Sequence, residues 1–439
     1  MNDEFLPEPL RQAAQERIDD HWYRSLVIGV VDGGESEVFA FGELDDGKKP
    51  DGDTVYEIGS ITKTFTATLL AADVLSGRCT LDTPVVEVLT GFKIAERNGK
   101  KITLGQLATH HSGLPCMPSN ILSEGSTDPY ADYDAEKMKA FLKDRQPSRD
   151  PGESFEYSNL AYGLLGHALA ESANTTYGPL LDRKIFQPLG MTMSAPELTE
   201  RMRQRLAIGR DEKGNPVEHF DFKALAGAGG ICSTANDMLR YLRANMGVDQ
   251  TPLTEAMRLA QRAIINTDKE TSIGLAWFST KTGVIWHNGG TAGHRSFLGF
   301  NADRNSGVIV LSDSCVSVDD LGLVVLREDA RLAPVLKQVP LSSVSFEEYQ
   351  GKYRLGDDFV IMVILCDEQF YVQRSGQSAL QILPSGRDEF FVKRTCISIN
   401  FTRDETGTVN GLILHQNGDH CARKLSAPEV LAEQESGNR

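Results

Sequence analysis

The sequence predicts an α/β fold: an antiparallel sheet flanked by helices, a helical subdomain beside it, and a small antiparallel β-barrel after it. Strand-like patterns of similar character occur near the N-terminus and again between residues 283 and 312. Residues 80–275 consist mostly of helical segments joined by Gly- and Pro-rich loops. The distant strands are therefore expected to share one sheet, with the helical middle inserted beside it.

The size and charge of the chain limit the number of domains and the kinds of partner that we expect. A length of 439 residues exceeds one ordinary hydrophobic core, so roughly two or three domains are expected. A hydrophobic content of 40% and a charged content of 24% are typical of soluble globular proteins. The net charge of −16 argues against nucleic-acid or anionic-membrane partners. The expected partner is a small molecule or short peptide, and homo-oligomerisation is left open.

The N-terminus and the cysteines bear on location and cofactors. Met1–Asp20 is charged and lacks the apolar middle of a secretory signal. This predicts a cytoplasmic protein if Met1 is the native start, and a periplasmic or secreted one if a signal peptide was removed. No apolar run approaches the roughly 20 residues of a membrane span.

The sequence has no close Cys-x-x-Cys pair, and His110–His111 and Glu218–His219 lack a third ligand at suitable spacing. We expect neither metal nor cofactor.

The first 75 residues predict a helix, three strands and a second helix. Leu6–Trp22 has the apolar spacing of a helix. The strand patterns that follow are Ser25–Val31, Ser36–Phe41 and Thr54–Ile58. Gly59 and Ser60 then open a strong helix, Ile61–Leu75.

Strand patterns return after the helical middle, at Gly283–His287, Arg295–Phe300 and Gly307–Ser312. From Phe346 to Leu425 the pattern changes to short alternating strands and turns, and no helix of ordinary length fits there. We therefore predict two domains, an α/β domain over residues 1–335 and a β-barrel over residues 340–427.

Ser60 and Lys63 form the first candidate for chemistry. They lie three residues apart at the start of the predicted helix, so the hydroxyl and the amine can touch. A serine hydroxyl needs an adjacent base, and a lysine can serve only when neutral. Lowering a lysine pKa from about 10.4 to about 7 costs on the order of 4–5 kcal/mol, which burial or positive charge must supply. Taken alone, Ser-x-x-Lys is common, and a helix cap with a solvated lysine is the favoured explanation.

Tyr157 and Asn159 form a second candidate, after the turn at Pro151–Gly152. A tyrosine beside a lysine can share its proton, acting as base in one step and as acid in the next. Asn159 offers a donor and an acceptor to a substrate amide. The structural alternative is that Tyr157 packs in the core and that Asn159 caps a helix.

The third candidate is the run His287-Asn288-Gly289-Gly290, directly after an apolar strand pattern. Glycines at this point let a ligand approach the strand backbone closely. The backbone N–H of Gly290 could complete an oxyanion hole opposite that of Ser60. His287, Asn288 and Gly289 would contact the substrate. A histidine that follows a strand more often has a structural role.

Together and in this order, the three motifs resemble the class C β-lactamase family of serine enzymes, with its relatives among D,D-peptidases, D-aminopeptidases and esterases. The resemblance extends from about residue 27 to 314, and the supporting runs are 102–115, 188–191, 229–237 and 307–311. It implies a serine β-lactamase or penicillin-binding-protein fold. It also implies that Ser60 becomes acylated and that Lys63 and Tyr157 transfer protons. Asn159 would help to hold the substrate.

The third motif departs from that of class C β-lactamases. Those enzymes carry Lys-Thr-Gly on the strand beside the active site, whereas Lys281-Thr282-Gly283 lies in the predicted turn before the strand. His287-Asn288-Gly289 instead lies at the distance from the following strand patterns that the family motif has. A motif that begins with histidine is more like those of the peptidase and esterase relatives. A mostly neutral His287 would bind a substrate carboxylate less firmly than lysine does.

The C-terminal module resembles the lipocalin-like β domain of some family members, on the runs Tyr349–Tyr353 and Phe370–Arg374. In such relatives it can cover the active-site mouth, and the alternatives are simple packing or a role in oligomers.

The sequence therefore predicts a serine hydrolase that cleaves small esters or D-amino-acid amides and peptides through an acyl-enzyme on Ser60. One alternative is a β-lactamase with genuine β-lactam turnover. Another is a non-hydrolytic penicillin-binding sensor or an acyltransferase. The joint presence of Ser60, Lys63 and Tyr157 argues against an inactive family member.

Overall fold

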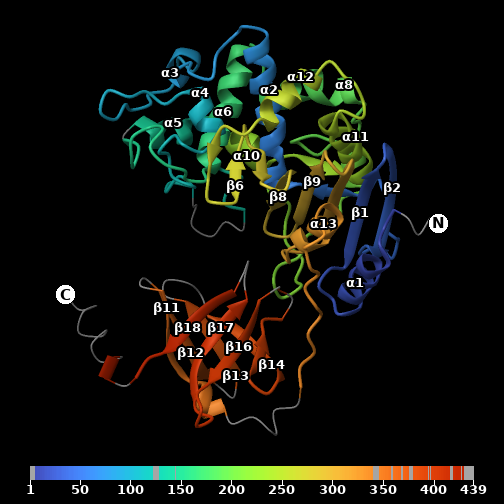
Figure 1. The fold of residues 1–439 in the computed structure, drawn as a ribbon. Helices are drawn as coiled ribbons and strands as arrows, with labels where there is room; N and C mark the ends of the chain where they lie inside the picture. The colour runs from blue at the N-terminus through green and yellow to red at the C-terminus, as the bar shows by residue number, and fades with distance from the viewer. Residues whose placement is uncertain are drawn as a thin grey trace. The chain divides into compact units, whose positions relative to one another are not determined.

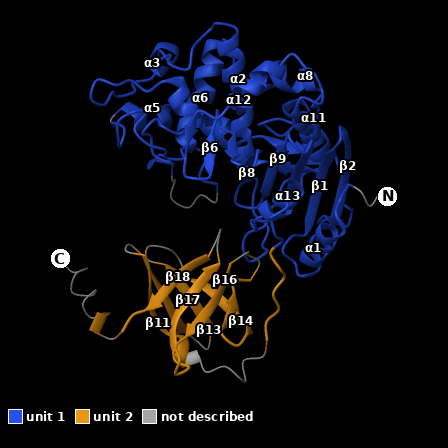
Figure 2. Cartoon of the chain, viewed as in Figure 1, with its two compact units in different colours: residues 1–332 blue, residues 333–439 orange. Residues whose placement is uncertain are grey.

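The computed structural model describes residues 5–121, 128–143, 145–339, 346–356, 359–366, 369–374, 379–393, 395, 397–415, 419–426 and 428–429. The chain divides into two compact units, residues 1–332 (unit 1) and residues 333–439 (unit 2), coloured separately in Figure 2. Each unit has its own hydrophobic core. The predicted domain limits at 340 and 427 lie outside the described residues.

In the described residues of unit 1, eight strands form an antiparallel sheet of order β2-β1-β10-β9-β8-β7-β6-β5 (Figure 1). The strands are β1 (Ser25–Asp32), β2 (Glu35–Gly42), β5 (Ile265–Asn266), β6 (Thr271–Ile273), β7 (Phe278–Thr280), β8 (Val284–Gly290), β9 (Arg295–Asn301) and β10 (Ser306–Ser312). β1 pairs with β10 from Leu26 opposite Ser312 to Asp32 opposite Ser306. This confirms that the distant N- and C-terminal strands share one sheet.

The predicted strand at residues 54–58 lies outside this sheet. β3 (Val55–Glu57) pairs with β4 (Cys232–Thr234) in a separate two-stranded ribbon. The segment forms a strand as predicted, but its partner comes from the helical middle of the chain.

The helices of unit 1 centre on α2 (Thr62–Leu75), which contacts α6 (Asn159–Ser172), α10 (Ala226–Gly229) and α12 (Thr254–Gln261). Its first ten residues are all buried, so α2 is a core helix rather than an amphipathic surface helix. The other helices are α1 (Glu8–Asp19), α3 (Val85–Val88), α4 (Leu104–Ala108), α5 (Ala135–Lys143), α7 (Tyr177–Leu181), α8 (Gln187–Leu189), α9 (Glu200–Arg203), α11 (Ala235–Met246) and α13 (Asp319–Leu326). Across the described ranges, none of these helices combines the length and apolar character needed to cross a membrane.

Helices cover both faces of the sheet. Neighbouring residues on a strand point to opposite faces, so Gly307 and Val308 of β10 face different helices. The Cβ side of Gly307 faces Leu242 of α11. The Cβ side of Gly299, which pairs with Val308, faces Leu326 of α13. Burial on both faces explains why β10 is apolar along most of its length and buried throughout.

Unit 2 contains a closed barrel in which each described strand pairs with the next along the chain and the last with the first. The strands are β11 (Gly351–Leu355), β12 (Phe359–Cys366), β13 (Gln369–Arg374), β14 (Leu380–Gly386), β15 (Glu389–Phe391), β16 (Ser398–Arg403), β17 (Val409–His415) and β18 (Asp419–Lys424). Aromatic rings of Tyr349, Phe370, Phe390 and Phe401 fill its interior, with centroids 4.7–6.4 Å apart. The predicted antiparallel β-barrel is confirmed.

The predicted division into two domains can be tested by truncation. Residues 1–332 alone should unfold in one cooperative transition, because this unit holds a contiguous core and a complete sheet. The measurement is thermal unfolding followed by circular dichroism, with the full chain as control. A truncated chain without a cooperative transition would show that unit 1 depends on the barrel.

Candidate functional site

Ser60 lies where a buried strand turns into a helix. Gly59 has φ +49°, a left-handed conformation that side chains disfavour. Ser60 follows in the short 3₁₀ turn Gly59–Ile61, which leads directly into α2. A Cβ on Gly59 would lie 2.6 Å from the backbone nitrogen of Gly290 on β8. The glycine therefore lets β8 approach the Ser60 turn closely.

Lys63 is fully buried one turn along from Ser60. Its Nζ lies 2.9 Å from Ser60 Oγ, 2.8 Å from Asn159 Oδ1 and 2.7 Å from the carbonyl oxygen of Ala228. Burial holds the pKa of Lys63 well below its usual 10.5. The solvated lysine that the motif alone favoured is therefore wrong.

These three contacts decide where the amine hydrogens point. An uncharged amine has two N–H donors and one lone pair. The oxygens of Asn159 and Ala228 can only accept hydrogen bonds, so they take the two N–H groups. The lone pair is then left for the hydroxyl hydrogen of Ser60. An amine in this arrangement can remove that hydrogen as a base.

Tyr157 lies against the same amine. Lys63 Nζ is 4.8 Å from the centroid of the tyrosine ring. Burial raises the pKa of Tyr157, and its hydrogen-bonding interaction with Ser60 acts in the opposite direction. The phenol is thus protonated at neutral pH. In the free protein Tyr157 can donate a proton, which is the acid half of its predicted role.

His110 is a neighbour that the sequence did not indicate as a site residue. Its ring stacks on Tyr157 with a centroid distance of 4.3 Å, and its Nδ1 accepts the backbone N–H of Ser158 at 2.9 Å. Burial lowers its pKa well below 6.5, so the imidazole is neutral. From the sequence, this histidine had no role beyond a rejected metal site and a place in the family-like run 102–115, because its stacking partner lies on a distant segment.

Asn159 is the first residue of α6, and Ser158 before it is the N-cap. Its Oδ1 accepts from Lys63, and its Nδ2 donates to Sδ of Met117 at 3.4 Å. Both ends of the amide are therefore engaged. The thioether is the weaker partner, so a substrate carbonyl would have to displace Met117 to reach this amide.

His287 is buried and uncharged. Its Nδ1–H donates to the carbonyl oxygen of Asn288 at 2.6 Å, and burial lowers its pKa to about 3. This tautomer leaves a lone pair on Nε2, so His287 offers no positive charge to a carboxylate. Asn288 faces the other side of β8 and donates to Asp319 of α13 at 2.8 Å. Lys281 is exposed in the turn before β8, 3.2 Å from Glu270.

Gly289 packs β8 against the residue that precedes the Ser60 turn. A Cβ on Gly289 would lie 2.0 Å from the carbonyl oxygen of Ile58. The hydroxyl of Ser296 on β9 donates to the same oxygen at 2.9 Å. These contacts fix the distance between the sheet and the Ser60 turn. Only glycine fits at position 289, because a side chain there would meet the backbone of Ile58.

The hairpin after β8 orients the backbone of Gly290. Thr291 N–H donates to the carbonyl oxygen of His294 at 3.1 Å and closes the hairpin. Hydrogen-bonded and non-bonded pairs alternate along antiparallel strands, so the next pair, Gly290 with Arg295, is a non-bonded one. The N–H of Gly290 therefore points away from β9, toward an edge that β7 does not cover, because β7 pairs only as far as Trp286.

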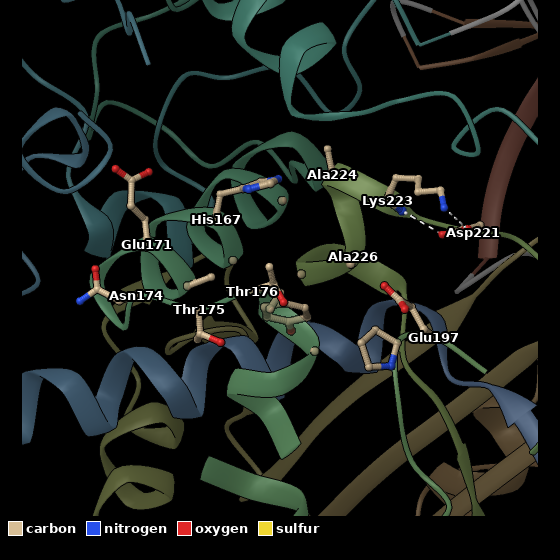
Figure 3. Close-up of a pocket in the computed structure, with 17 residues that line it drawn as sticks. His167, Glu171, Asn174, Thr175, Thr176, Glu197, Asp221, Lys223, Ala224 and Ala226 are labelled. Atoms are coloured by element: carbon tan, nitrogen blue, oxygen red, sulfur yellow. Dashed lines mark hydrogen bonds and ion pairs between the residues drawn. The ribbon is translucent and has the colours of Figure 1, made fainter. Parts of the chain in front are cut away.

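A cavity of about 490 Å³ lies between α6 and α10, and none of the predicted site residues lines it (Figure 3). Ala226 and Gly227 of α10 form part of its wall. The next residue, Ala228, holds the Lys63 amine. The short helix α10 thus contributes both to the wall of this cavity and to the contacts of Lys63.

Residues 10–324 match the Beta-lactamase family, which is well over half of the chain. The chain belongs to the beta-lactamase family. Members of this family are serine hydrolases, and the match covers the elements that carry Ser60, Lys63, Tyr157 and Gly290. The resemblance drawn from the three motifs is therefore confirmed.

Characterised family members include peptidases and β-lactamases. The D-alanyl-D-alanine-carboxypeptidase/endopeptidase AmpH of Escherichia coli (strain K12) is 28% identical over 321 residues, covering 67% of this chain and 82% of that protein. A Beta-lactamase of Pseudomonas fluorescens is 29% identical over 261 residues, 57% of this chain and 68% of that protein. Penicillin-binding protein 4* of Bacillus subtilis (strain 168) is 21% identical over 442 residues. That alignment covers 91% of this chain and 94% of that protein.

Solved structures of the beta-lactamase family share the fold of unit 1. A class C beta-lactamase from Rhodobacter sphaeroides aligns with a TM-score of 0.61 at 24% identity, covering 70% of this chain and 93% of that chain. A beta-lactamase/D-alanine carboxypeptidase from Pseudomonas syringae aligns with a TM-score of 0.62 at 23% identity, with the same coverage. The predicted fold class is confirmed.

The close approach of β8 to Ser60 predicts the effect of a single methyl group. Gly289→Ala should lower the Ser60-dependent rate by about 100-fold, because the methyl pushes β8 and the Gly290 N–H out of place. Gly91→Ala is the matched control, since a Cβ there meets only the end of Lys139 at 3.9 Å. The measurement is labelling of Ser60 by a fluorophosphonate together with thermal unfolding. Equal labelling of the two variants would contradict the expectation.

Proposed function

We propose that this protein hydrolyses small esters or D-amino-acid amides and peptides through an acyl-enzyme on Ser60. The observation that carries the proposal is the buried Lys63 amine 2.9 Å from the Ser60 hydroxyl, with a pKa that burial holds well below its usual 10.5. A lowered lysine pKa favours the neutral amine, and only the neutral amine can take the proton of a serine nucleophile.

In the acylation step, Ser60 Oγ attacks the substrate carbonyl carbon and its proton moves to Lys63 Nζ. The carbonyl oxygen becomes an oxyanion that the backbone N–H groups of Ser60 and Gly290 stabilise. The carbon–nitrogen or carbon–oxygen bond to the leaving group then breaks. The leaving group takes a proton from Tyr157, whose raised pKa keeps it protonated in the free protein. Tyr157 recovers that proton from Lys63, which lies against its ring.

In the deacylation step, a water molecule attacks the acyl carbon and gives a proton to Lys63, whose amine is again neutral. The ester bond to Ser60 breaks, Ser60 Oγ takes that proton back, and a carboxylic acid leaves. Each group ends in its starting protonation state, so the cycle consumes one water and needs no cofactor.

Esters and D-amino-acid amides are favoured over β-lactams because position 287 holds an uncharged histidine instead of a lysine. A carboxypeptidase/endopeptidase name among the relatives supports the peptide half of this class. Beta-lactamase names among them make β-lactam turnover the alternative to be measured in the same assay.

Removal of the nucleophile tests the mechanism. Ser60→Ala should lower turnover by about 10⁴-fold or more, because no other group can form the acyl-enzyme. Ser76→Ala, an exposed serine at the other end of α2, is the control. The measurement is a panel of p-nitrophenyl esters, D-amino-acid p-nitroanilides and nitrocefin tested side by side. Full activity in Ser60→Ala would refute the proposal, and a preference for nitrocefin would identify a β-lactamase.

The protonation state of Lys63 predicts the pH dependence. Activity should fall as the pH is lowered through the pKa of Lys63, because only the neutral amine accepts the Ser60 proton. Burial places this acidic limb of the pH–activity profile well below pH 10.5. Lys63→Arg should lose about 100- to 10⁴-fold, since a guanidinium stays protonated. His287→Asn is the comparison: with a pKa of about 3, His287 cannot cause a limb near neutral pH. A limb that disappears in His287→Asn would contradict this assignment. The measurement is kcat/KM against pH.

A further inference from the structure

A buried carboxylate lies three residues before Ser60 and takes no part in the proton transfers described above. Glu57 is the last residue of β3, and its exposed fraction is 5%. Burying an ionised carboxylate is unfavourable unless hydrogen-bond donors or positive charges surround it. The groups around Glu57 therefore show what this charge is used for.

The first contacts of Glu57 come from residues 219 and 220. His219 Nδ1–H donates to Glu57 Oε1 at 2.8 Å. The backbone N–H of Phe220 donates to the same oxygen at 3.3 Å. The Glu218–His219 pair, whose spacing argued against a metal site, thus supplies a hydrogen-bond donor to a carboxylate far away in the sequence.

The second contacts of Glu57 come from the hairpin after β8. Burial raises the pKa of Glu57, but His294 and the hydroxyl of Thr291 are among the groups that lower it below its usual 4.5. The ring of His294 also packs edge-on against Tyr56, the residue before Glu57, with centroids 6.0 Å apart. Both ends of the hairpin therefore lie beside the same carboxylate.

The hairpin and the segment that leads to His219 also pack closely against each other. A Cβ on Gly293 would lie 2.4 Å from the side chain of Val217 and 2.6 Å from the backbone of Gly209. This glycine lets the two segments approach without a side chain between them. They form one support around Glu57.

Glu57 thus connects the two segments that carry the N–H groups of the proposed oxyanion hole. β3 leads into the turn that holds the Ser60 N–H, and the hairpin orients the Gly290 N–H. Stabilisation of an oxyanion requires both donors to lie roughly 2.7–3.1 Å from one oxygen atom. A link between the two segments holds the donors to that spacing.

We propose that Glu57, held by His219, is a positioning residue that sets the separation of the Ser60 and Gly290 N–H groups. This rests on the proposed function, because an oxyanion hole matters only if Ser60 attacks a carbonyl. Glu57 touches neither the substrate nor the transferred protons, and acts through the Ser60 turn and the hairpin. In the competing explanation, the Glu57 contacts stabilise the fold of unit 1 and have no specific effect on the site.

Binding of a transition-state analogue separates these explanations. A boronic acid forms a tetrahedral, anionic adduct with a nucleophilic serine, and one oxygen of the adduct can occupy the oxyanion hole. Glu57→Gln keeps the size of the side chain and removes its charge. It should weaken binding of phenylboronic acid, and lower kcat/KM for p-nitrophenyl acetate, by about 10- to 100-fold each. Both are measured well below the melting temperature of the variant, where a loss of stability alone changes neither.

A lowered melting temperature with unchanged boronic acid affinity and unchanged kcat/KM would overturn the proposal. Glu255→Gln is the matched control, because this carboxylate is exposed on α12 and pairs with Arg258. The control variant should bind phenylboronic acid as tightly as the wild-type protein does.

His219→Ala tests the same link if Glu57→Gln does not fold. The histidine is partly exposed, and its removal takes away the donor at 2.8 Å. Binding of phenylboronic acid should weaken by about threefold to 30-fold. Where both variants fold, the double variant should lose little more than Glu57→Gln alone, because the two residues act through one contact. Unchanged binding in His219→Ala, or additive losses in the double variant, would contradict the proposed link.

The same titration distinguishes a failure of this proposal from a failure of the proposed function. Ser60→Ala reports whether phenylboronic acid binds through the Ser60 hydroxyl. If the wild-type protein forms no Ser60 adduct and takes no fluorophosphonate, the proposed function fails, and the role of Glu57 fails with it. If the wild-type protein forms the adduct and Glu57→Gln forms it equally tightly, the nucleophile stands and only the role of Glu57 is refuted.

Discussion

The site depends on the desolvation of one amine. Lys63 is buried, and its hydrogen-bond partners inside the protein include two oxygens that only accept. Each comes from a different helix, Asn159 from α6 and Ala228 from α10, and both helices contact α2. The packing of three helices removes the amine from water, which lowers its pKa and favours the neutral form, with a lone pair for the Ser60 proton.

A second constraint is the distance between the sheet and the Ser60 turn. Gly59 and Gly289 leave no space for a methyl group, since a Cβ on either would meet backbone atoms at 2.6 and 2.0 Å. The contact places the free backbone edge of β8 beside Ser60. His110, His287 and Tyr157 near Lys63 are uncharged at neutral pH, because burial lowers the pKa of both histidines and raises that of the tyrosine.

Much of the fold and part of the site followed from the sequence. Strand alternation and helical spacing are local patterns, so the sheet, the barrel and the contact of Ser60 with Lys63 could be predicted. The pairing of β3 with β4, the stacking of His110 on Tyr157 and the commitment of Asn159 to Lys63 could not, because they join segments far apart in the chain. The Ala228 partner is a backbone oxygen, which no residue type reveals. The sequence by itself determined which groups could react. Only the tertiary structure decided which are charged, because desolvation depends on what distant segments pack around each group.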